Sequence, residues 1–168
     1  MSAVKVFIAG SRAISRLNDA VRSRLDRIMA ERHSVLIGDA NGADKAVQKY
    51  LADHRYVDVT VYFTGLNFRN NVGAWRVRAI HPAAGVNGGF EFYAAKDRAM
   101  ADDATHGLML WDGESRGTFA NINNLIRQHK PVAVYVGSAR EFVNVKSDAD
   151  IDVLLSKASP SANMKHPA

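Results

Sequence analysis

Short apolar runs alternate along the chain with segments in which apolar residues recur every three or four positions. The short runs predict buried strands over residues 4–9, 34–37, 57–63, 107–111 and 131–136. The longer periods predict helices over residues 14–28, 43–51, 90–104 and 119–129. Ser15 is the expected N-cap of the first helix.

Strands that alternate with helices indicate a parallel sheet covered by helices on both faces. We therefore expect an α/β fold, a three-layer Rossmann-like open sheet with strand order 3-2-1-4-5. In such sheets ligands bind beyond the carboxyl ends of the strands, where the strand order reverses, which is between strands 1 and 4 here. We expect one domain over residues 1–155 and a disordered tail over residues 156–168.

No regular pattern is visible over residues 64–89, which hold several glycines. A loop of this length in a compact domain is usually a functional lid or locally disordered. We interpret Arg69, Asn70 and Trp75 as candidates for a lid that holds phosphate and stacks on a base. The alternative is a packed surface loop in which Trp75 fills the core.

Three strand-to-helix turns rich in glycine meet at the same edge of the expected sheet. Glycine lets a ligand approach the backbone, and the N–H groups of a first helical turn have no intrahelical partners, so such turns suit an anion. The candidate phosphate-binding residues are Gly10, Ser11, Arg12, Gly113, Ser115, Arg116, Gly117 and Thr118. The candidate ribose- and nucleotide-binding residues are Gly38, Asp39, Gly42 and Asp44. The alternative for each turn is a helix cap without a ligand.

One acidic residue lies on a helix face that otherwise points to the core. Tyr93, Asp97 and Met100 share this face by their spacing, so Asp97 is either paired or functional, and it is our candidate catalytic residue. Lys96 and Arg98 flank Asp97 and are expected to point to other sides.

Composition excludes several classes of site. The chain has no cysteine, which excludes disulfides, thiolate nucleophiles and cysteine-based zinc sites. Its six histidines are scattered, so we expect no metal site. Neither the Gly-x-Gly-x-x-Gly fingerprint nor a Gly-Lys-Ser/Thr loop occurs, which disfavours ordinary dehydrogenases and ATPases.

Charge and hydropathy bear on partners and location. The net charge is +5, but the basic residues form no dense stripe, so we do not expect nucleic acid as a partner. No run approaches the roughly 20 apolar residues of a membrane span, and the first strand starts too early for a signal peptide. We expect no membrane partner and a cytoplasmic protein.

Taken in order, Gly10-Ser11-Arg12, the turn at 38–44 and the turn at 111–118 resemble three motifs of the SLOG superfamily. These Rossmann-like proteins are related to the Lonely Guy phosphoribohydrolases and to Smf/DprA. The similarity spans roughly residues 3–137 and is greatest to the YspA-like branch. It implies binding of nucleotides or nucleotide-derived ligands such as ADP-ribose or NAD derivatives, and related families imply a homo-oligomer.

The chain departs from the Lonely Guy pattern at its catalytic positions. Asn121 stands where those enzymes carry a glutamate, and their Arg-Lys-x-x-Met motif reads Asp97-Arg98-Ala99-Met100 here. Asparagine cannot serve as a general base or a carboxylate nucleophile. Cleavage through that arrangement is disfavoured, although Asp97 or Asp39 could still serve.

Three hypotheses follow from the sequence. The first is a sensor or carrier that binds a small nucleotide or an NAD derivative. The second is a hydrolase of an N-glycosidic bond, acting on a nucleoside phosphate or NAD, whose activity would be lost on Asp97→Asn. The third is a DNA-associated role of the Smf/DprA kind.

Overall fold

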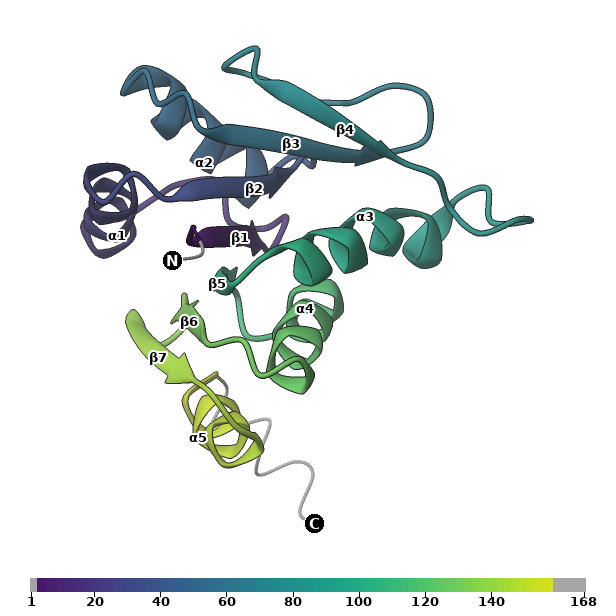
Figure 1. The fold of residues 1–168 in the computed structure, drawn as a ribbon. Coiled ribbons are helices and arrows are strands. Elements are labelled where there is room, and N and C mark those ends of the chain that lie inside the picture. The colour runs from purple at the N-terminus through teal and green to yellow at the C-terminus, as the bar shows by residue number, and fades with distance from the viewer. Residues whose placement is uncertain (1–2, 159–168) are drawn as a thin grey trace.

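A seven-stranded sheet forms the middle layer of the fold, with helices on both faces (Figure 1). The structure is a computed structural model and describes residues 3–158. Neighbouring strands run parallel except for the last pair, β6 and β7. The order across the sheet is β4-β3-β2-β1-β5-β6-β7. The strands are β1 (Lys5–Gly10), β2 (Ser34–Gly38), β3 (Val59–Thr64), β4 (Arg76–Ile80), β5 (His106–Trp111), β6 (Val132–Val136) and β7 (Glu141–Val145).

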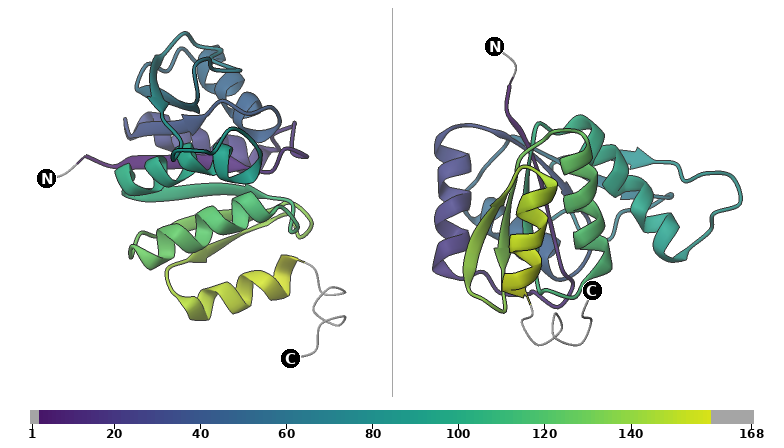
Figure 2. Two further views of the ribbon diagram at one scale, coloured as in Figure 1. Left: turned by 90° about the vertical axis from the view of Figure 1, so that its right-hand side faces the viewer. Right: turned by 90° about the horizontal axis from the view of Figure 1, so that it is seen from below.

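Each face of the sheet carries its own hydrophobic core. The core under α1 and α2 is built around Val21, Leu25, Val47 and Leu51, all of which are almost fully buried. The core on the other face lies under α3, α4 and α5, and Figure 2 shows these three helices from two further sides. The helices are α1 (Asp19–Ala30), α2 (Ala43–Asp53), α3 (Gly89–Asp103), α4 (Arg116–Arg127) and α5 (Asp148–Ala158).

The Rossmann-like α/β architecture is confirmed, and the five expected strands are β1, β2, β3, β5 and β6 in the expected relative order. The sheet also has one strand more at each edge. The interpretation of residues 64–89 as a patternless loop is wrong at its centre, where β4 pairs in parallel with β3. Because β4 has one neighbour and mostly exposed side chains, no buried face marks it in the sequence.

Two boundaries differ from the prediction. The helix expected from residue 14 begins at Asp19, and its N-cap is Asn18, whose side chain accepts a hydrogen bond from Val21 N–H. Ser15 does not cap it, and residues 11–18 cross the end of the sheet as a loop. At the other end of the chain, α5 extends to Ala158, past the expected domain limit at residue 155. The remainder of the expected tail, 159–168, lies outside the described residues.

Within residues 3–158, no helix combines the length and the apolar character needed to cross a lipid bilayer.

Candidate functional site

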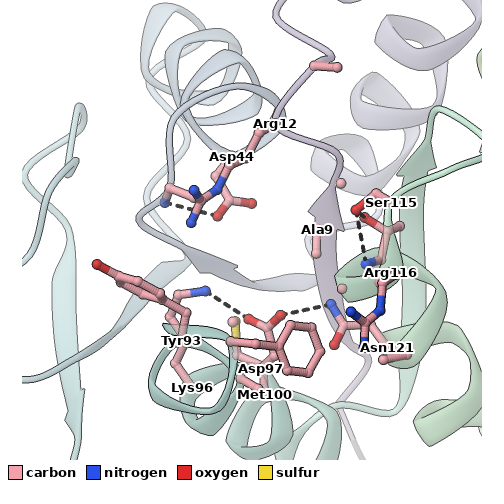
Figure 3. Close-up of a pocket in the computed structure, with 18 of the residues that line it drawn as sticks. Ala9, Arg12, Asp44, Tyr93, Lys96, Asp97, Met100, Ser115, Arg116 and Asn121 are labelled. Carbon is pink, nitrogen blue, oxygen red and sulfur yellow. Dashed lines mark hydrogen bonds and ion pairs between the residues drawn. The ribbon is translucent and has the colours of Figure 1, made fainter. Parts of the chain in front are cut away.

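A pocket of about 580 Å³ opens at the carboxyl ends of β1 and β5, where the strand order reverses (Figure 3). Its walls are the loops that follow β1, β2 and β5, together with the first turns of α3 and α4. This is the edge of the sheet at which ligands bind in doubly wound folds.

The loops after β1 and β5 are joined by hydrogen bonds. Ser11 N–H donates to the Leu110 carbonyl at 2.9 Å, and Asp112 N–H donates to the buried Ser11 hydroxyl at 3.1 Å. Asp112 in turn accepts from the N–H groups of Glu114 and Ser115, both at 2.8 Å. These bonds fix the turn that leads into α4, whose N-cap is Ser115.

The loop after β2 completes the rim, and an ion pair ties it to the segment before β4. Asp39 is 2 % exposed and accepts three hydrogen bonds from Arg69, from the backbone N–H at 2.9 Å, Nε at 3.2 Å and Nη2 at 2.9 Å. Asn70 donates to the Asp39 carbonyl at 2.8 Å. Both oxygens of the Asp39 carboxylate are therefore occupied by Arg69.

A row of polar side chains crosses the floor of the pocket, as Figure 3 shows. Lys96 Nζ donates to Asp97 Oδ1 at 2.8 Å, and Asn121 Nδ2 donates to Asp97 Oδ2 at 3.0 Å. Lys96 is 5 % exposed, and although burial lowers its pKa, the carboxylates of Asp97 and Asp44 raise that pKa above its ordinary value. The row therefore presents a fixed ammonium group and a fixed carboxylate, and both carboxylate oxygens already accept a hydrogen bond.

Asp44 is the one side chain of this pocket that is buried with an unused acceptor among the described residues. Its Oδ2 accepts from Ala40 N–H at 3.1 Å, while its Oδ1 has no hydrogen-bond partner. Burial raises the pKa of Asp44 to about 7, against the opposing effect of the Lys96 ammonium. A buried carboxylate oxygen without a partner costs free energy, so it marks a place for a donor from a ligand.

The absence of a side chain at Gly38 lets Asp44 and Lys96 approach the end of β2. A Cβ atom at this position would lie 2.6 Å from Asp44 Oδ2 and 3.1 Å from Lys96 Nζ. A larger residue would therefore displace the two charged groups from the pocket floor.

Two arginines face the pocket without a carboxylate partner within residues 3–158. Arg12 lies over the Tyr93 ring, 5.6 Å from its centroid, and Arg116 lies over the Phe90 ring at 5.5 Å. Both rings come from the first turns of α3, and Arg69 also covers Tyr93 at 4.5 Å. Figure 3 shows Arg12 on the Asp44 side of the pocket and Arg116 on the Asn121 side. Guanidinium groups held by stacking keep their donors available for an anion.

Most of the residues singled out in the sequence meet at this pocket. The lining includes Gly10, Arg12, Asp44, Arg69, Asp97, Ser115, Arg116, Gly117 and Thr118. The remaining candidates do not line the pocket, and they are Ser11, Gly38, Asp39, Gly42, Asn70, Gly113 and Trp75.

The position of Trp75 does not match its interpretation as a lid residue. Its indole packs against the core under α1 and α2, and its Nε1–H donates to the Tyr56 carbonyl at 2.8 Å. The alternative interpretation, a packed loop in which Trp75 fills the core, describes this arrangement.

Sequence reasoning missed Lys96 and Phe90 as site residues. Lys96 was expected to point away from the face of Asp97, but it is buried beside it. Helix periodicity places Lys96 to one side of the face, and only the carboxylates of Asp97 and Asp44 together make burial of its ammonium favourable. A lysine directly next to an acid on a core-facing helix was the available signal.

The fold has a counterpart of known structure, although no protein-family model matches the chain and no curated protein matches its sequence. DNA processing protein A from Helicobacter pylori, which binds single-stranded DNA, superposes with a TM-score of 0.60 at 16 % sequence identity. The match covers 93 % of this chain and 74 % of that protein. At 16 % identity the similarity shows a shared fold and nothing further. This fold agrees with the Smf/DprA-related architecture that we expected from the sequence.

This neighbour corrects one expectation. We did not expect nucleic acid as a partner, because the basic residues form no dense stripe. A protein with the same fold binds single-stranded DNA, so the lack of a stripe is no ground for excluding nucleic acid.

Proposed function

We propose that the pocket binds a nucleotide, with its phosphate held between Arg12 and Arg116. The observation that carries this proposal is that neither arginine has a carboxylate partner within residues 3–158, although both line one pocket. A pocket of about 580 Å³ is in the usual size range for small-ligand sites. The adjoining start of α4 adds backbone N–H groups and the positive end of a helix dipole.

The remaining groups of the pocket suit the other parts of a nucleotide. The unpartnered Asp44 Oδ1 would accept a hydrogen bond from a sugar hydroxyl. Tyr93 and Phe90 offer aromatic faces at the mouth of the pocket on which a base would stack. This combination supports a nucleotide sensor or carrier of the YspA-like SLOG branch, with AMP, ADP-ribose or NAD as ligand types.

Binding, rather than cleavage, is the function that these contacts favour. Both oxygens of Asp97 accept hydrogen bonds, from Lys96 and Asn121. Asp97 orients its two partners through these bonds, and its neighbour Asn121 cannot act as a general base or a carboxylate nucleophile. We propose that Asp97 positions Lys96 and Asn121 in the pocket.

Thermal unfolding in the presence of ligand tests this proposal. A nucleotide at a hundred times its dissociation constant adds about 2.7 kcal/mol of stability, which raises the melting temperature of a domain of this size by roughly 5–10 °C. Absence of any shift with AMP, ADP-ribose and NAD at millimolar concentration would contradict the proposal.

The arginines can be tested separately. Losing one charge-assisted contact to phosphate costs about 1.5–3 kcal/mol, so Arg12→Ala and Arg116→Ala should each weaken binding roughly 10- to 100-fold. Arg127→Ala is the matched control, because Arg127 is exposed at the far end of α4, the helix that carries Arg116. Equal affinities of all three variants would show that the phosphate binds elsewhere.

A second candidate function is the binding of single-stranded DNA, and the fold of DNA processing protein A favours it. The net charge of +5 is compatible with it. Fluorescence anisotropy with an oligothymidylate over a series of salt concentrations is the direct test. The logarithm of affinity should fall with the logarithm of salt by about 0.7 for each phosphate contacted. Competition by AMP would show whether the strand uses the same pocket, and a flat salt dependence would dismiss this function.

A further inference from the structure

A second pocket, of about 330 Å³, lies at the opposite end of the sheet from the candidate site. It is bounded by the amino ends of β1, β5 and β6 and by the second half of α1. Because β7 runs antiparallel to β6, the end of β7 also reaches this rim. None of its lining residues belongs to the first pocket, so the two are separate features.

Positive charge dominates this second pocket. Arg24, Arg27 and Lys146 line it together with one carboxylate, Glu31. Glu31 already engages Arg27 at 3.8 Å and His33 at 2.7 Å. With the histidines neutral, three cations and one carboxylate leave two positive charges uncompensated among the lining residues.

The side-chain cations of Arg24 and Lys146 have no carboxylate partner within the described part of the chain, although the backbone N–H of Lys146 donates to Asp150 at 2.9 Å. Arg24 is held over the Phe142 ring, 4.4 Å from its centroid, with its donors free. Partial burial, with a smaller contribution from Arg27, lowers the pKa of Arg24. A partly buried arginine beside a second cation is stabilised when an anion joins it.

The floor of the pocket is apolar, because the strand ends contribute Val6, Leu108 and Val132. A volume of about 330 Å³ is at the lower end of the range for small-ligand sites, which limits the ligand to a small molecule. A small ligand that combines a doubly charged anionic group with a compact apolar body would match this lining.

We propose that this pocket binds a small phosphomonoester, with its phosphoryl group between Arg24, Arg27 and Lys146 and its apolar part on the strand ends. A phosphomonoester dianion neutralises the two uncompensated charges, and it accepts several hydrogen bonds from the guanidinium groups. This site goes beyond the proposed nucleotide site and does not depend on it, since the two share no residue.

Phenyl phosphate is a suitable probe, followed by amide NMR of the full chain. We expect saturable shifts of the amides of Gly107 and Ala133, which line the second pocket. Arg24→Gln and Lys146→Gln should each weaken binding by about tenfold or more, as the loss of a charge-assisted hydrogen bond implies. Lys146 is exposed, so its variant should fold even if replacement of Arg24 disturbs the core.

Two substitutions outside the second pocket serve as controls. Arg22→Gln changes the same charge on an exposed position of α1 and should leave the affinity unchanged. Arg12→Ala, in the first pocket, should leave the affinity read from the Gly107 and Ala133 amides unchanged, because these two residues line only the second pocket. The proposal is overturned by unsaturated shifts, by equal binding of neutral phenol, or by shifts that map only to the first pocket. Tighter binding of an oligonucleotide to the same amides would overturn the assignment to a small molecule.

Discussion

Replacing Asp44 by asparagine should flatten the dependence of folding stability on pH. Asp44 is 6 % exposed, and burial raises its pKa from 3.8 to about 7. Between these pH values the folded chain holds a proton that the unfolded chain has released. The free energy of unfolding therefore falls as pH rises through this window, and the contribution is lost once pH exceeds the folded-state pKa.

The size of the effect follows from the two pKa values. With one titrating group, the wild-type chain loses about 2.5 kcal/mol of unfolding free energy between about pH 5 and pH 8 through Asp44 alone. An asparagine has no proton to release, so this loss is absent in the variant. Lys96, Asp97 and Asp39, the charged groups that act on Asp44, are present in both chains, so the comparison isolates the loss of the Asp44 carboxyl group.

Urea unfolding of the ligand-free wild type and of Asp44→Asn, followed by circular dichroism at several pH values, measures this difference. The variant should gain about 2.5 kcal/mol relative to wild type as pH is raised from about 5 to 8. Asp53→Asn on the same helix is the control, because the Asp53 side chain is 60 % exposed and its replacement should leave the slope unchanged. Parallel curves for wild type and Asp44→Asn would refute the reasoning, because Asp44 would then be ionised in the folded chain throughout.

Four further substitutions test the packing of the glycine turns and the strength of two ion pairs. Gly10→Ala would place a Cβ atom 2.6 Å from a backbone oxygen of β5, and such overpacking should cost about 1–3 kcal/mol in urea unfolding. Gly117→Ala meets nothing within 4 Å on α4 and should stabilise the chain by about 0.5–1 kcal/mol. Arg69→Ala leaves the buried Asp39 carboxylate without its side-chain partner and should lower the free energy of unfolding by about 2–3 kcal/mol. This cost is smaller than for a fully buried ion pair, because the Arg69 side chain is 31 % exposed and the backbone N–H of residue 69 still donates to Asp39. Arg76→Ala, which breaks an exposed pair, should change stability by about 1 kcal/mol or less.

The two glycine variants form one matched pair and the two arginine variants another. The result for each pair can contradict the physical reason given for it. Equal costs for the two alanine-for-glycine variants would mean that β1 and β5 can separate to accept a methyl group. Equal costs for the two arginine variants would mean that Asp39 finds another donor, and that Arg69 does not tie the loop after β2 to the segment before β4.

The central strands were predictable because they are buried on both faces. Residues such as Phe7, Ile37 and Val134 are fully buried, and continuous apolar runs result. The edge strands gave no such signal. β4 exposes Arg76 and Arg78, and β7 exposes Glu141 and Asn144, so neither has the composition of a core strand. Their pairing depends on neighbours that lie next to them only after folding.

In the candidate site, too, some residues could be predicted from the sequence and others could not. Turns such as Gly10-Ser11-Arg12 were visible because glycine, serine and arginine act locally, through backbone geometry and hydrogen bonds. Lys96 was harder to predict, because its burial depends on Asp44, which is on another helix, as well as on the adjacent Asp97. The lid interpretation of Trp75 depended on a loop that the edge strand β4 interrupts. The homo-oligomer and the identity of the ligand remain predictions.

The central place of β1 has a consequence for synthesis of the protein. β1 pairs with β2 on one side, but its other partner, β5, begins at His106, about 100 residues later in the chain. At translation rates of roughly 5–20 residues per second, this interval is on the order of 5–20 s. During that time the nascent half-sheet ends in an open apolar strand, and such an edge promotes aggregation. The strand that provides the first loop of the pocket therefore completes its pairing only after more than half of the chain has been synthesised.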